Sequence, residues 1–378
     1  MKVLIVQKIA GISGSENYLL NLMPALSERG VEVEFLGLFE ERSKRSIEPL
    51  LEKLSALKVK FHLVAVGVYP SLKPLMDIRK LIKNGKFDLV HTNLIHADLF
   101  IVLTKILFLQ KLKIVSGKHG FDENYTKQYG FTIKKGFKNF YVIIAKFCER
   151  FIDRSYCISK GILNVFEGLG ISKKAKIDLI YYGFDFNHQI FPSFSLRKTS
   201  KQLLIVGRLV PYKGHEFAIR AMTSVISKHK EANLTIVGGG AYEMYLKKLV
   251  KELNLEKYVS FEGHQSNVIE YIYNSDILIV PSIAEGFGIV FLEAFSQKKP
   301  VVAFDVPAAN EIIEPDLSGI LVKPYEVEAL ANSLVSLLES PEKMKAYGER
   351  GFSMLASYYN LSRMVNETVA FYGKAIEN

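Results

Sequence analysis

The most chemically suggestive residues in the sequence are two glutamates separated by a loop that contains two glycines. An apolar run, Ile277–Val280, is typical of a buried strand, and it leads into Glu285-Gly286-Phe287-Gly288 and then a helical segment that carries Glu293. Glycines let a backbone approach a ligand closely, and the N–H groups that begin the next helix can bind an anion. Glu293 could accept hydrogen bonds from a polyol such as a ribose, and Glu285 from a second set of hydroxyls.

The two glutamates have other interpretations. They could be ordinary side chains of a solvated helix, or they could form the carboxylate pair of a hydrolase. Eight residues of helix rise about 12 Å, whereas hydrolytic pairs need carboxyls about 5–9.5 Å apart. The spacing therefore favours two contacts along one elongated ligand, although the loop could shorten the distance.

Two cations follow another strand candidate, Gln202–Val206. Arg208 and Lys213 flank a turn that contains Pro211 and Gly214. Arginine offers a fork of donors and lysine a compact charge, a combination that suits a diphosphate. Two unrelated surface cations are the alternative, which the nearby Glu285–Glu293 loop makes less attractive.

These residues are positioned by strands that alternate with helix-length segments. The pattern predicts α/β architecture with two doubly wound, Rossmann-like parallel sheets, whose ligands bind at the carboxyl ends of the strands. We expect domains at residues 1–192 and 193–378, a linker at Ser193–Lys201, and a final helix (about 358–376) that packs back on the first domain. The strand candidates are Val3–Val6, Val31–Leu36, Lys60–Val64, Asp88–His91, Lys113–Val115, Gln202–Val206, Asn233–Val237, Tyr258–Phe261, Ile277–Val280 and Pro300–Ala303.

Composition excludes several classes of protein. The 378 residues are 49% hydrophobic and 23% charged, which excludes a disordered chain and a membrane bundle. The longest apolar stretch, Leu99–Leu109, contains Lys105 and is shorter than the about 20 residues of a membrane span. The N-terminus is typical of a strand that enters a loop rather than of a signal peptide. The two cysteines, Cys148 and Cys157, lack a disulfide or metal-site pattern, which favours a reducing, cytoplasmic setting.

No metal site is expected. The sequence has no Asp-x-Asp triplet and no carboxylate cluster suited to Mg²⁺. No Cys, third His or carboxylate cluster lies near His91 and His96.

Charge is distributed unevenly between the two halves. Of 49 basic and 39 acidic residues, residues 1–190 hold 29 and 18, which leaves 20 and 21 for the rest. Residues 125–151 combine six basic residues and eight aromatic ones with one acid. This mixture suits an anionic membrane surface, although RNA binding or a core helix with a solvated basic face would also explain it. We favour the membrane, as a peripheral attachment or acceptor surface, and no nucleic acid; the candidate residues are Lys134, Lys135, Lys138, Phe140 and Tyr141.

The motifs together resemble the "glycosyl transferases group 1" family, family 4-like retaining glycosyltransferases with the two-domain GT-B architecture. The resemblance is carried by Gly207-Arg208-Leu209-x-x-x-Lys213-Gly214 and by Glu285-Gly286-Phe287-Gly288 with Glu293. Weaker similarities lie at residues 12–30, 87–93, 115–120 and 180–185. The sequence departs from the family pattern at Ser13, Tyr182 and Asn93, of which Asn93 replaces a common second histidine.

The resemblance implies a role for each matching residue. Arg208 and Lys213 would bind the nucleotide diphosphate, Glu293 the ribose, and Glu285 the transferred sugar, with His119 facing the sugar from the N-terminal domain. The other donor-binding residues would be Gly14, Gly238, His264, Gly286, Phe287, Gly288 and Ile289.

The implied reaction moves a hexose from a nucleotide-sugar, with UDP favoured over GDP on family frequency alone. The acceptor would be a lipid-linked or other saccharide in surface polysaccharide synthesis, held by the N-terminal domain. The resemblance implies retention of anomeric configuration; we expect no cofactor beyond this co-substrate, and a location at the inner face of the cytoplasmic membrane.

Two other classes of protein remain as alternatives. A Rossmann oxidoreductase would need a G-x-G-x-x-G motif, yet residues 237–243 lack its last glycine and Gly11 and Gly14 are wrongly spaced. In a non-enzymatic membrane- or nucleic-acid-binding protein, the second half of the chain, whose charges nearly balance, would have no use for Arg208, Lys213, Glu285 and Glu293.

Overall fold

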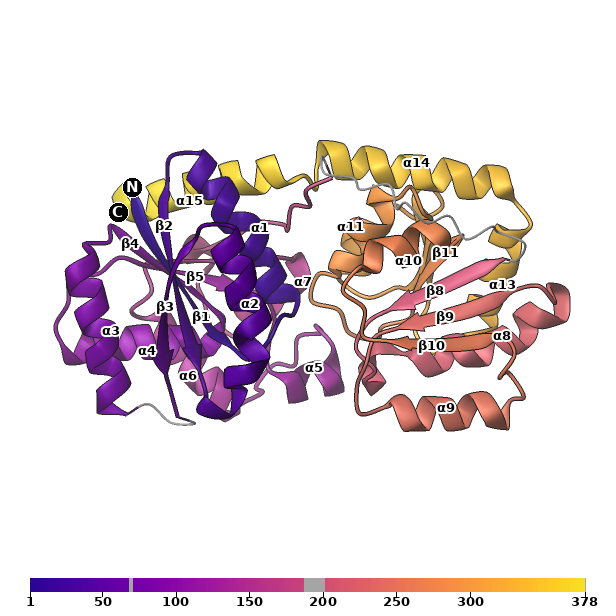
Figure 1. The fold of residues 1–378 in the computed structure, drawn as a ribbon, viewed down its shortest axis with the longest axis horizontal. Helices are drawn as coiled ribbons and strands as arrows, with labels where there is room; N and C mark the ends of the chain where they lie inside the picture. Colours follow the sequence, from indigo (N-terminus) through magenta and orange to yellow (C-terminus); the bar gives the residue numbers. More distant parts are fainter. Residues whose placement is uncertain (68–70, 187–200, 378) are drawn as a thin grey trace. The chain divides into compact units, whose positions relative to one another are not determined.

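A computed structural model describes residues 1–67, 71–186 and 201–377. The chain divides into two compact units, shown in Figure 1. Unit 1 comprises Met1–Tyr125, Thr132–Asp185 and Leu361–Asn378, and unit 2 comprises Thr126–Phe131 and Phe186–Asn360. Of the expected linker, Ser193–Lys201, only Lys201 lies within the described residues.

Unit 1 contains a parallel sheet of seven strands among the described residues, in the order β3-β2-β1-β4-β5-β6-β7. Its central strands β4 and β5 are buried along their whole length because helices cover both faces. Val3, Leu4, Ile5 and Val6 of β1 are all fully buried. The strands are β1 (Lys2–Ile9), β2 (Glu32–Phe39), β3 (Lys60–Ala65), β4 (Leu89–Asn93), β5 (Ile114–Lys118), β6 (Arg154–Cys157) and β7 (Ile177–Leu179).

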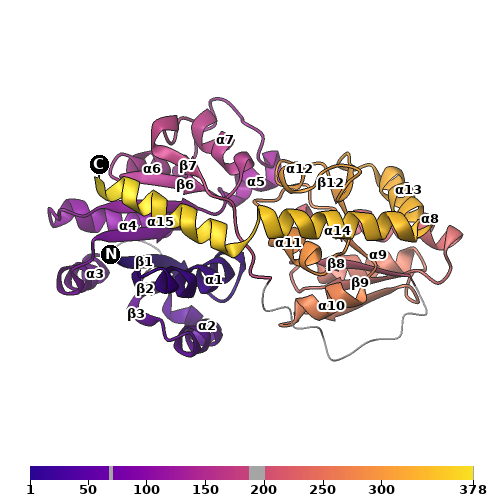
Figure 2. The same ribbon diagram turned by 90° about the horizontal axis from the view of Figure 1, so that it is seen from above.

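The helices of unit 1 pack in two groups. Helix α4 contacts both α3 and α6, and α1 contacts both α2 and the final helix α15. Figure 2 shows α15 running beside α1. The bounds are α1 (Gly14–Glu28), α2 (Lys44–Ala56), α3 (Leu72–Gly85), α4 (Leu94–Leu107), α5 (Glu123–Tyr129), α6 (Phe140–Glu149), α7 (Lys160–Gly168) and α15 (Leu361–Glu377).

Unit 2 contains a parallel sheet of six strands among the described residues, in the order β10-β9-β8-β11-β12-β13. The strands are β8 (Gln202–Val206), β9 (Asn233–Val237), β10 (Val259–Gly263), β11 (Ile277–Val280), β12 (Val301–Phe304) and β13 (Gly319–Val322). The helices are α8 (His215–Lys228), α9 (Glu243–Glu252), α10 (Val268–Asn274), α11 (Ile289–Ser296), α12 (Ala309–Ile312), α13 (Val327–Leu338) and α14 (Pro341–Ser357).

The predicted α/β fold with two doubly wound parallel sheets is confirmed. Three strands were not predicted, and each has a weak pattern. Strand β6 reads Arg-Ser-Tyr-Cys, β7 has three residues, and β13 begins with a glycine. A side-chain contact supports the pairing of β6 with β7, because Arg154 of β6 donates a hydrogen bond of 2.7 Å to Asp178 of β7.

Candidate active site

The strand order of unit 2 has a topological switch point at the carboxyl ends of β8 and β11, which we call the crevice. From β8 the chain proceeds outward to β9 and β10, then returns to the other side for β11, β12 and β13. Ligands bind at such switch points in open α/β sheets. Arg208 follows β8 and Glu285 follows β11, so two sequence-predicted residues flank this crevice.

The turn after β8 brings together both predicted cations and Glu285. The Lys213 Nζ lies 2.5 Å from Oε2 of Glu285, and both side chains are largely buried. Tyr212 lies between the cations: Arg208 donates a hydrogen bond to its hydroxyl, and Lys213 Nζ lies 6.0 Å from its ring centroid. Tyr212 was not among the predicted residues, although its position between two cations in the turn could have signalled it.

Two glycines allow loops of this crevice to pass close to other backbone. Gly214 has φ +71°, and a Cβ there would lie 1.8 Å from the Pro281 carbonyl oxygen. Gly238, after β9, has φ +144°, and its Cβ would lie 1.9 Å from the carbonyl oxygen of Gly207. Both conformations are strained for any other residue. The turn that carries Arg208 and Lys213 therefore depends on glycine at both places.

Glu293 lies on α11, which begins at Ile289 directly after Gly288. The Glu293 side chain is half-buried, and no hydrogen bond or ion pair joins its carboxyl group to another residue in the described part of the chain. Burial raises its pKa from 4.5 to about 7. A carboxyl group removed from water without a protein partner is suited to hydroxyls of a ligand.

The remaining predicted residues of unit 2 lie at the same edge of the sheet. Gly286 and the buried Phe287 belong to the loop after β11, and the Phe287 ring lies 6.2 Å from that of Tyr359. His264 is exposed directly after β10, two strands from β8. His215, which was not predicted, is fully buried at the start of α8; burial and the charge of Lys213 lower its pKa to about 4.

In unit 1, His119 follows β5 and is held by side chains from neighbouring elements. Its Nε2 lies 2.7 Å from Oδ1 of Asn93, and its ring lies 4.4 Å edge-on from that of Tyr18. Burial, together with the adjacent Lys118 charge, lowers the pKa of His119 to about 3. His119 is therefore a neutral imidazole at physiological pH.

Gly14 is the first residue of α1, and a buried carboxylate already caps that helix end. Glu16 accepts a hydrogen bond of 3.0 Å from the Ser13 N–H and one of 2.6 Å from Nε2 of Gln7. The Ser-x-x-Glu capping pattern at Ser13 could have revealed Glu16 in the sequence. An anion that approaches Gly14 would meet this carboxylate at the same helix end.

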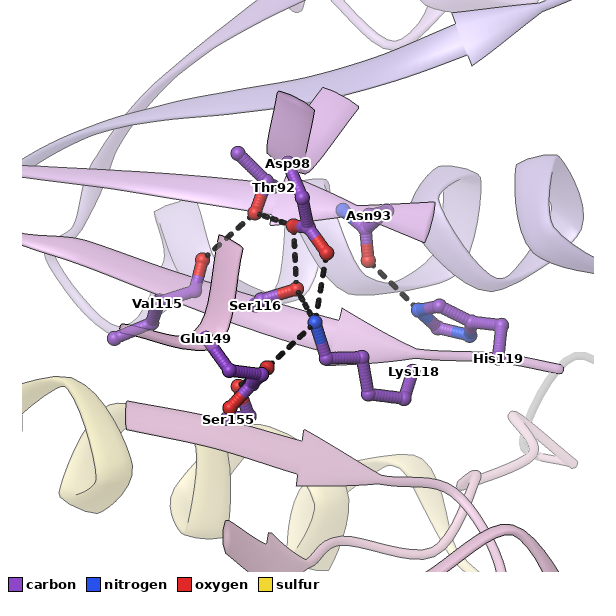
Figure 3. Close-up of polar contacts among 9 residues, drawn as sticks. All are labelled: Thr92, Asn93, Asp98, Val115, Ser116, Lys118, His119, Glu149 and Ser155. Atoms are coloured by element: carbon purple, nitrogen blue, oxygen red, sulfur yellow. Dashed lines mark hydrogen bonds and ion pairs between the residues drawn. The ribbon is translucent and has the colours of Figure 1, made fainter. Parts of the chain in front are cut away.

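A buried ion network lies behind His119 and was also missed (Figure 3). Lys118 Nζ lies 2.7 Å from Asp98 Oδ2 and 2.9 Å from Glu149 Oε1. Ser116 donates to Asp98, and Ser155 donates to Glu149. The two carboxylates raise the pKa of Lys118, and the Lys118 charge lowers that of Glu149. Asp98 lies inside the largely apolar α4 and Glu149 ends the largely apolar α6, which was the available signal.

The predicted basic surface lies on α6 and the segment before it. Lys134, Lys135 and Lys138 are exposed, and Phe140 is 72% exposed. Tyr141 is half-buried, with its ring 4.9 Å from that of Phe121. Ile143, one turn after Phe140, is 61% exposed and was not predicted.

Two further observations concern metals and membranes. Within residues 1–67, 71–186 and 201–377, no three His, Cys, Asp or Glu side chains are grouped in a way that could hold a metal ion. No helix in the described part of the chain combines the length and the apolar character needed to cross a bilayer.

The described strands form two Rossmann-like domains, and comparisons with known proteins identify the family. Residues 12–188 match Glycosyltransferase Family 4, and residues 187–354 match Glycosyl transferases group 1. The chain belongs to this family of glycosyltransferases, as its motifs predicted, and it has the GT-B architecture. The oxidoreductase and non-enzymatic alternatives are therefore set aside.

Relatives and solved structures match over different lengths. An uncharacterized glycosyltransferase of Haemophilus influenzae is 25% identical over 96% of this chain and 97% of its own. A GDP-mannose-dependent mannosyltransferase of Corynebacterium glutamicum, which acts on a monoacylated phosphatidylinositol monomannoside, is 35% identical over 38% of this chain and 39% of its own. The crystal structure of Anabaena Alr3699/HepE with UDP and glucose has a TM-score of 0.82 at 19% identity, covering 99% of this chain and 100% of that chain.

Proposed function

We propose that this glycosyltransferase transfers a hexose from a UDP-sugar, and that the crevice between β8 and β11 is its donor site. The Lys213–Glu285 pair carries the proposal, because it joins a cation for the diphosphate to a carboxylate for sugar hydroxyls at one strand edge. Arg208 supplies a second cation from the same turn. Glu293, whose carboxyl group has no partner among the described residues, is a fitting acceptor for ribose hydroxyls.

Comparisons with two other proteins support UDP rather than GDP as the donor nucleotide. The Anabaena protein, whose fold matches nearly the whole of this chain, holds UDP and, in another crystal, UDP-glucose. The relative that uses GDP-mannose matches over 38% of this chain. Both observations describe other proteins, and together they favour UDP.

The mechanism follows from the charge that develops when the sugar leaves the diphosphate. Arg208, Lys213 and the N–H groups that begin α11 would stabilise the departing negative charge, which is a large contribution in a partly desolvated site. These donors would suffice without a metal ion. We also propose that the enzyme retains the anomeric configuration, and the support for this is the resemblance to the family.

We further propose that unit 1 holds a lipid-linked or saccharide acceptor at an anionic membrane surface, in surface polysaccharide synthesis. The support is the patch formed by Phe140 and Ile143 beside Lys134, Lys135 and Lys138. Exposed apolar side chains flanked by cations fit the headgroup region of an anionic bilayer.

A ligand-binding experiment tests the donor site. Isothermal titration with UDP, GDP, ADP and NAD should give the tightest binding for UDP, and Lys213→Ala should weaken it. Tighter binding of GDP would overturn the choice of base. Equal, weak binding of all four would overturn the donor site itself.

A further inference from the structure

Asn93 and His119 meet at the carboxyl ends of two neighbouring strands (Figure 3). Asn93 is the last residue of β4 and pairs in register with Gly117 of β5, two residues before His119. The Asn93 Oδ1 lies 2.7 Å from the His119 Nε2. An amide oxygen can only accept a hydrogen bond, so Nε2 must carry the proton of the neutral ring. The other ring nitrogen, Nδ1, then has a free lone pair.

The surroundings of His119 keep the ring neutral and oriented. The titratable groups that face it are Lys118 beside it on β5, Tyr18 of α1, Tyr156 of β6 and His91 of β4. None of these is an anion, and Lys118 is a buried cation. The Tyr18 ring packs against the imidazole at 4.4 Å and fixes its plane.

Gly117 makes room for the hydrogen bond between the two side chains. A Cβ at this position would lie 2.7 Å from Asn93 Oδ1 and 2.9 Å from His119 Nε2. It would also lie 2.6 Å from the hydroxyl of Tyr156. The backbone between β4 and β5 is therefore compatible with this contact only where a glycine stands.

The two side chains differ in what their remaining polar atoms contact. Asn93 is fully buried, and its Nδ2 has no hydrogen-bond partner among the described residues. His119 is partly exposed. Its Nδ1 makes no hydrogen bond to a described residue, and it is not one of the buried atoms that lack a partner. Nδ1 is therefore open to solvent. A buried amide whose N–H group has no partner lowers the stability of the fold. The presence of Asn93 is therefore better explained by its hydrogen bond to His119 than by stability.

We propose that Asn93 is a positioning residue that holds His119 in the Nε2–H tautomer, so that Nδ1 is available to accept a hydrogen bond from a ligand hydroxyl. The ligand part rests on the proposed function, whereas the tautomer part rests on unit 1 alone. Asn93 is one of the positions at which this chain departs from the family pattern. The acceptor nitrogen of His119 is thus set by a residue that stands where the family commonly has a histidine.

Nitrogen NMR on protein labelled at histidine tests the tautomer directly, with His119→Gln used to assign the signals. In the ligand-free wild type at pH 8, His119 should show a protonated Nε2 and an unprotonated Nδ1. Asn93→Asp keeps an acceptor oxygen and should keep this pattern. Asn93→Leu removes the acceptor at similar volume and should give a mixture of both tautomers, with circular dichroism confirming that it folds. A protonated Nδ1 in the wild type, or an unchanged pattern in Asn93→Leu, would refute the proposal.

Titration with UDP-glucose tests the ligand part. It should shift the Nδ1 signal of His119 in the wild type, and Asn93→Leu should lower kcat for UDP-glucose turnover more than it raises KM. Binding of UDP-glucose with no change at Nδ1 would refute the ligand contact. Absence of UDP-glucose binding would instead count against the proposed function, while the tautomer measurement would still decide the role of Asn93.

Discussion

The Nζ atom of Lys213 lies 2.5 Å from Oε2 of Glu285, which means that the cation proposed to bind a diphosphate is already paired with a carboxylate. A ligand must therefore share or replace this partner. The pair also fixes the turn after β8 against the loop after β11.

Replacement of the cation is the most direct test of this arrangement. Lys213→Ala should reduce turnover of UDP-glucose by about 10²–10³, the usual loss for one donor to a developing negative charge. The matched control is Lys248→Ala on α9, a 76% exposed lysine whose ion-pair partner is Glu252. The control should retain wild-type turnover. Turnover near the wild-type rate in Lys213→Ala would contradict the assignment of the diphosphate site.

Glu293 should make stability fall as pH rises. Its folded-state pKa is about 7, raised from 4.5. Between these values the folded protein holds a proton that the unfolded chain has released, so the free energy of unfolding falls with rising pH. At about 1.4 kcal/mol per pKa unit, the loss is about 3 kcal/mol above pH 7.

Glu293→Gln mimics the protonated carboxyl group and should remove this dependence. Urea unfolding should give similar stabilities for the variant and the wild type near pH 4.5, and a more stable variant at pH 8. The variant should nevertheless bind UDP more weakly, because an amide accepts hydrogen bonds from ribose less strongly than a carboxylate does. Equal stabilities at pH 8 would show that Glu293 is not desolvated.

The fold, and the placement of the unit 2 residues at one edge of its sheet, could be predicted from the sequence because both depend on local patterns. Strand–helix alternation predicts parallel sheets, and the turn around Lys213 and the loop around Glu285 directly follow strands of one sheet. Tyr212 and His215 were missed because the hydrogen bond from Arg208 to the Tyr212 hydroxyl and the burial of His215 depend on how the turn folds. Lys118 was missed for the same reason: its partners, Asp98 and Glu149, come from α4 and α6, far apart in sequence.

Two adjacent glycines offer a contrast in backbone strain. At Gly238 a Cβ would lie 1.9 Å from the Gly207 carbonyl oxygen, whereas at Gly239 a Cβ would have no atom of the described residues within 4 Å apart from its chain neighbours. Gly238→Ala should lower the free energy of unfolding by about 1–3 kcal/mol, the usual range for overpacking, and should weaken UDP binding. Gly239→Ala should match the wild type in both. Thermal unfolding and titration with UDP measure these effects, and equal behaviour of the two variants would contradict the close approach.

Removal of the buried Lys118 charge should strongly destabilise unit 1. Lys118→Met leaves Asp98 and Glu149 without their cation, and removal of one partner of a buried pair costs about 3–5 kcal/mol. Lys113→Met is the control, because Lys113 is 34% exposed and lies 3.8 Å from Asp153; it should cost at most about 1 kcal/mol. Chemical unfolding compares the two. Equal losses would mean that the network is solvated.

The surface of α6 leads to a prediction about membranes. Phe140 and Ile143 are 72% and 61% exposed, and they follow the exposed Lys134, Lys135 and Lys138. Replacing both apolar residues by serine removes the insertion into the headgroup region while leaving the charges, so flotation with vesicles of phosphatidylglycerol should fall by an order of magnitude or more. Replacing the three lysines by glutamine should remove the salt-sensitive part of binding, because about 1 kcal/mol per cation comes from attraction to anionic lipid.

Met244 on α9 provides the control for exposed apolar area, because it is 85% exposed but belongs to unit 2. Met244→Ser should bind vesicles as the wild type does. Vesicles of phosphatidylcholine alone should bind the wild type weakly, since they lack the negative charge that attracts the lysines. Equal binding to both kinds of vesicle, or equal loss in Met244→Ser, would exclude α6 as the docking surface, and the basic half would then be an ordinary solvated face.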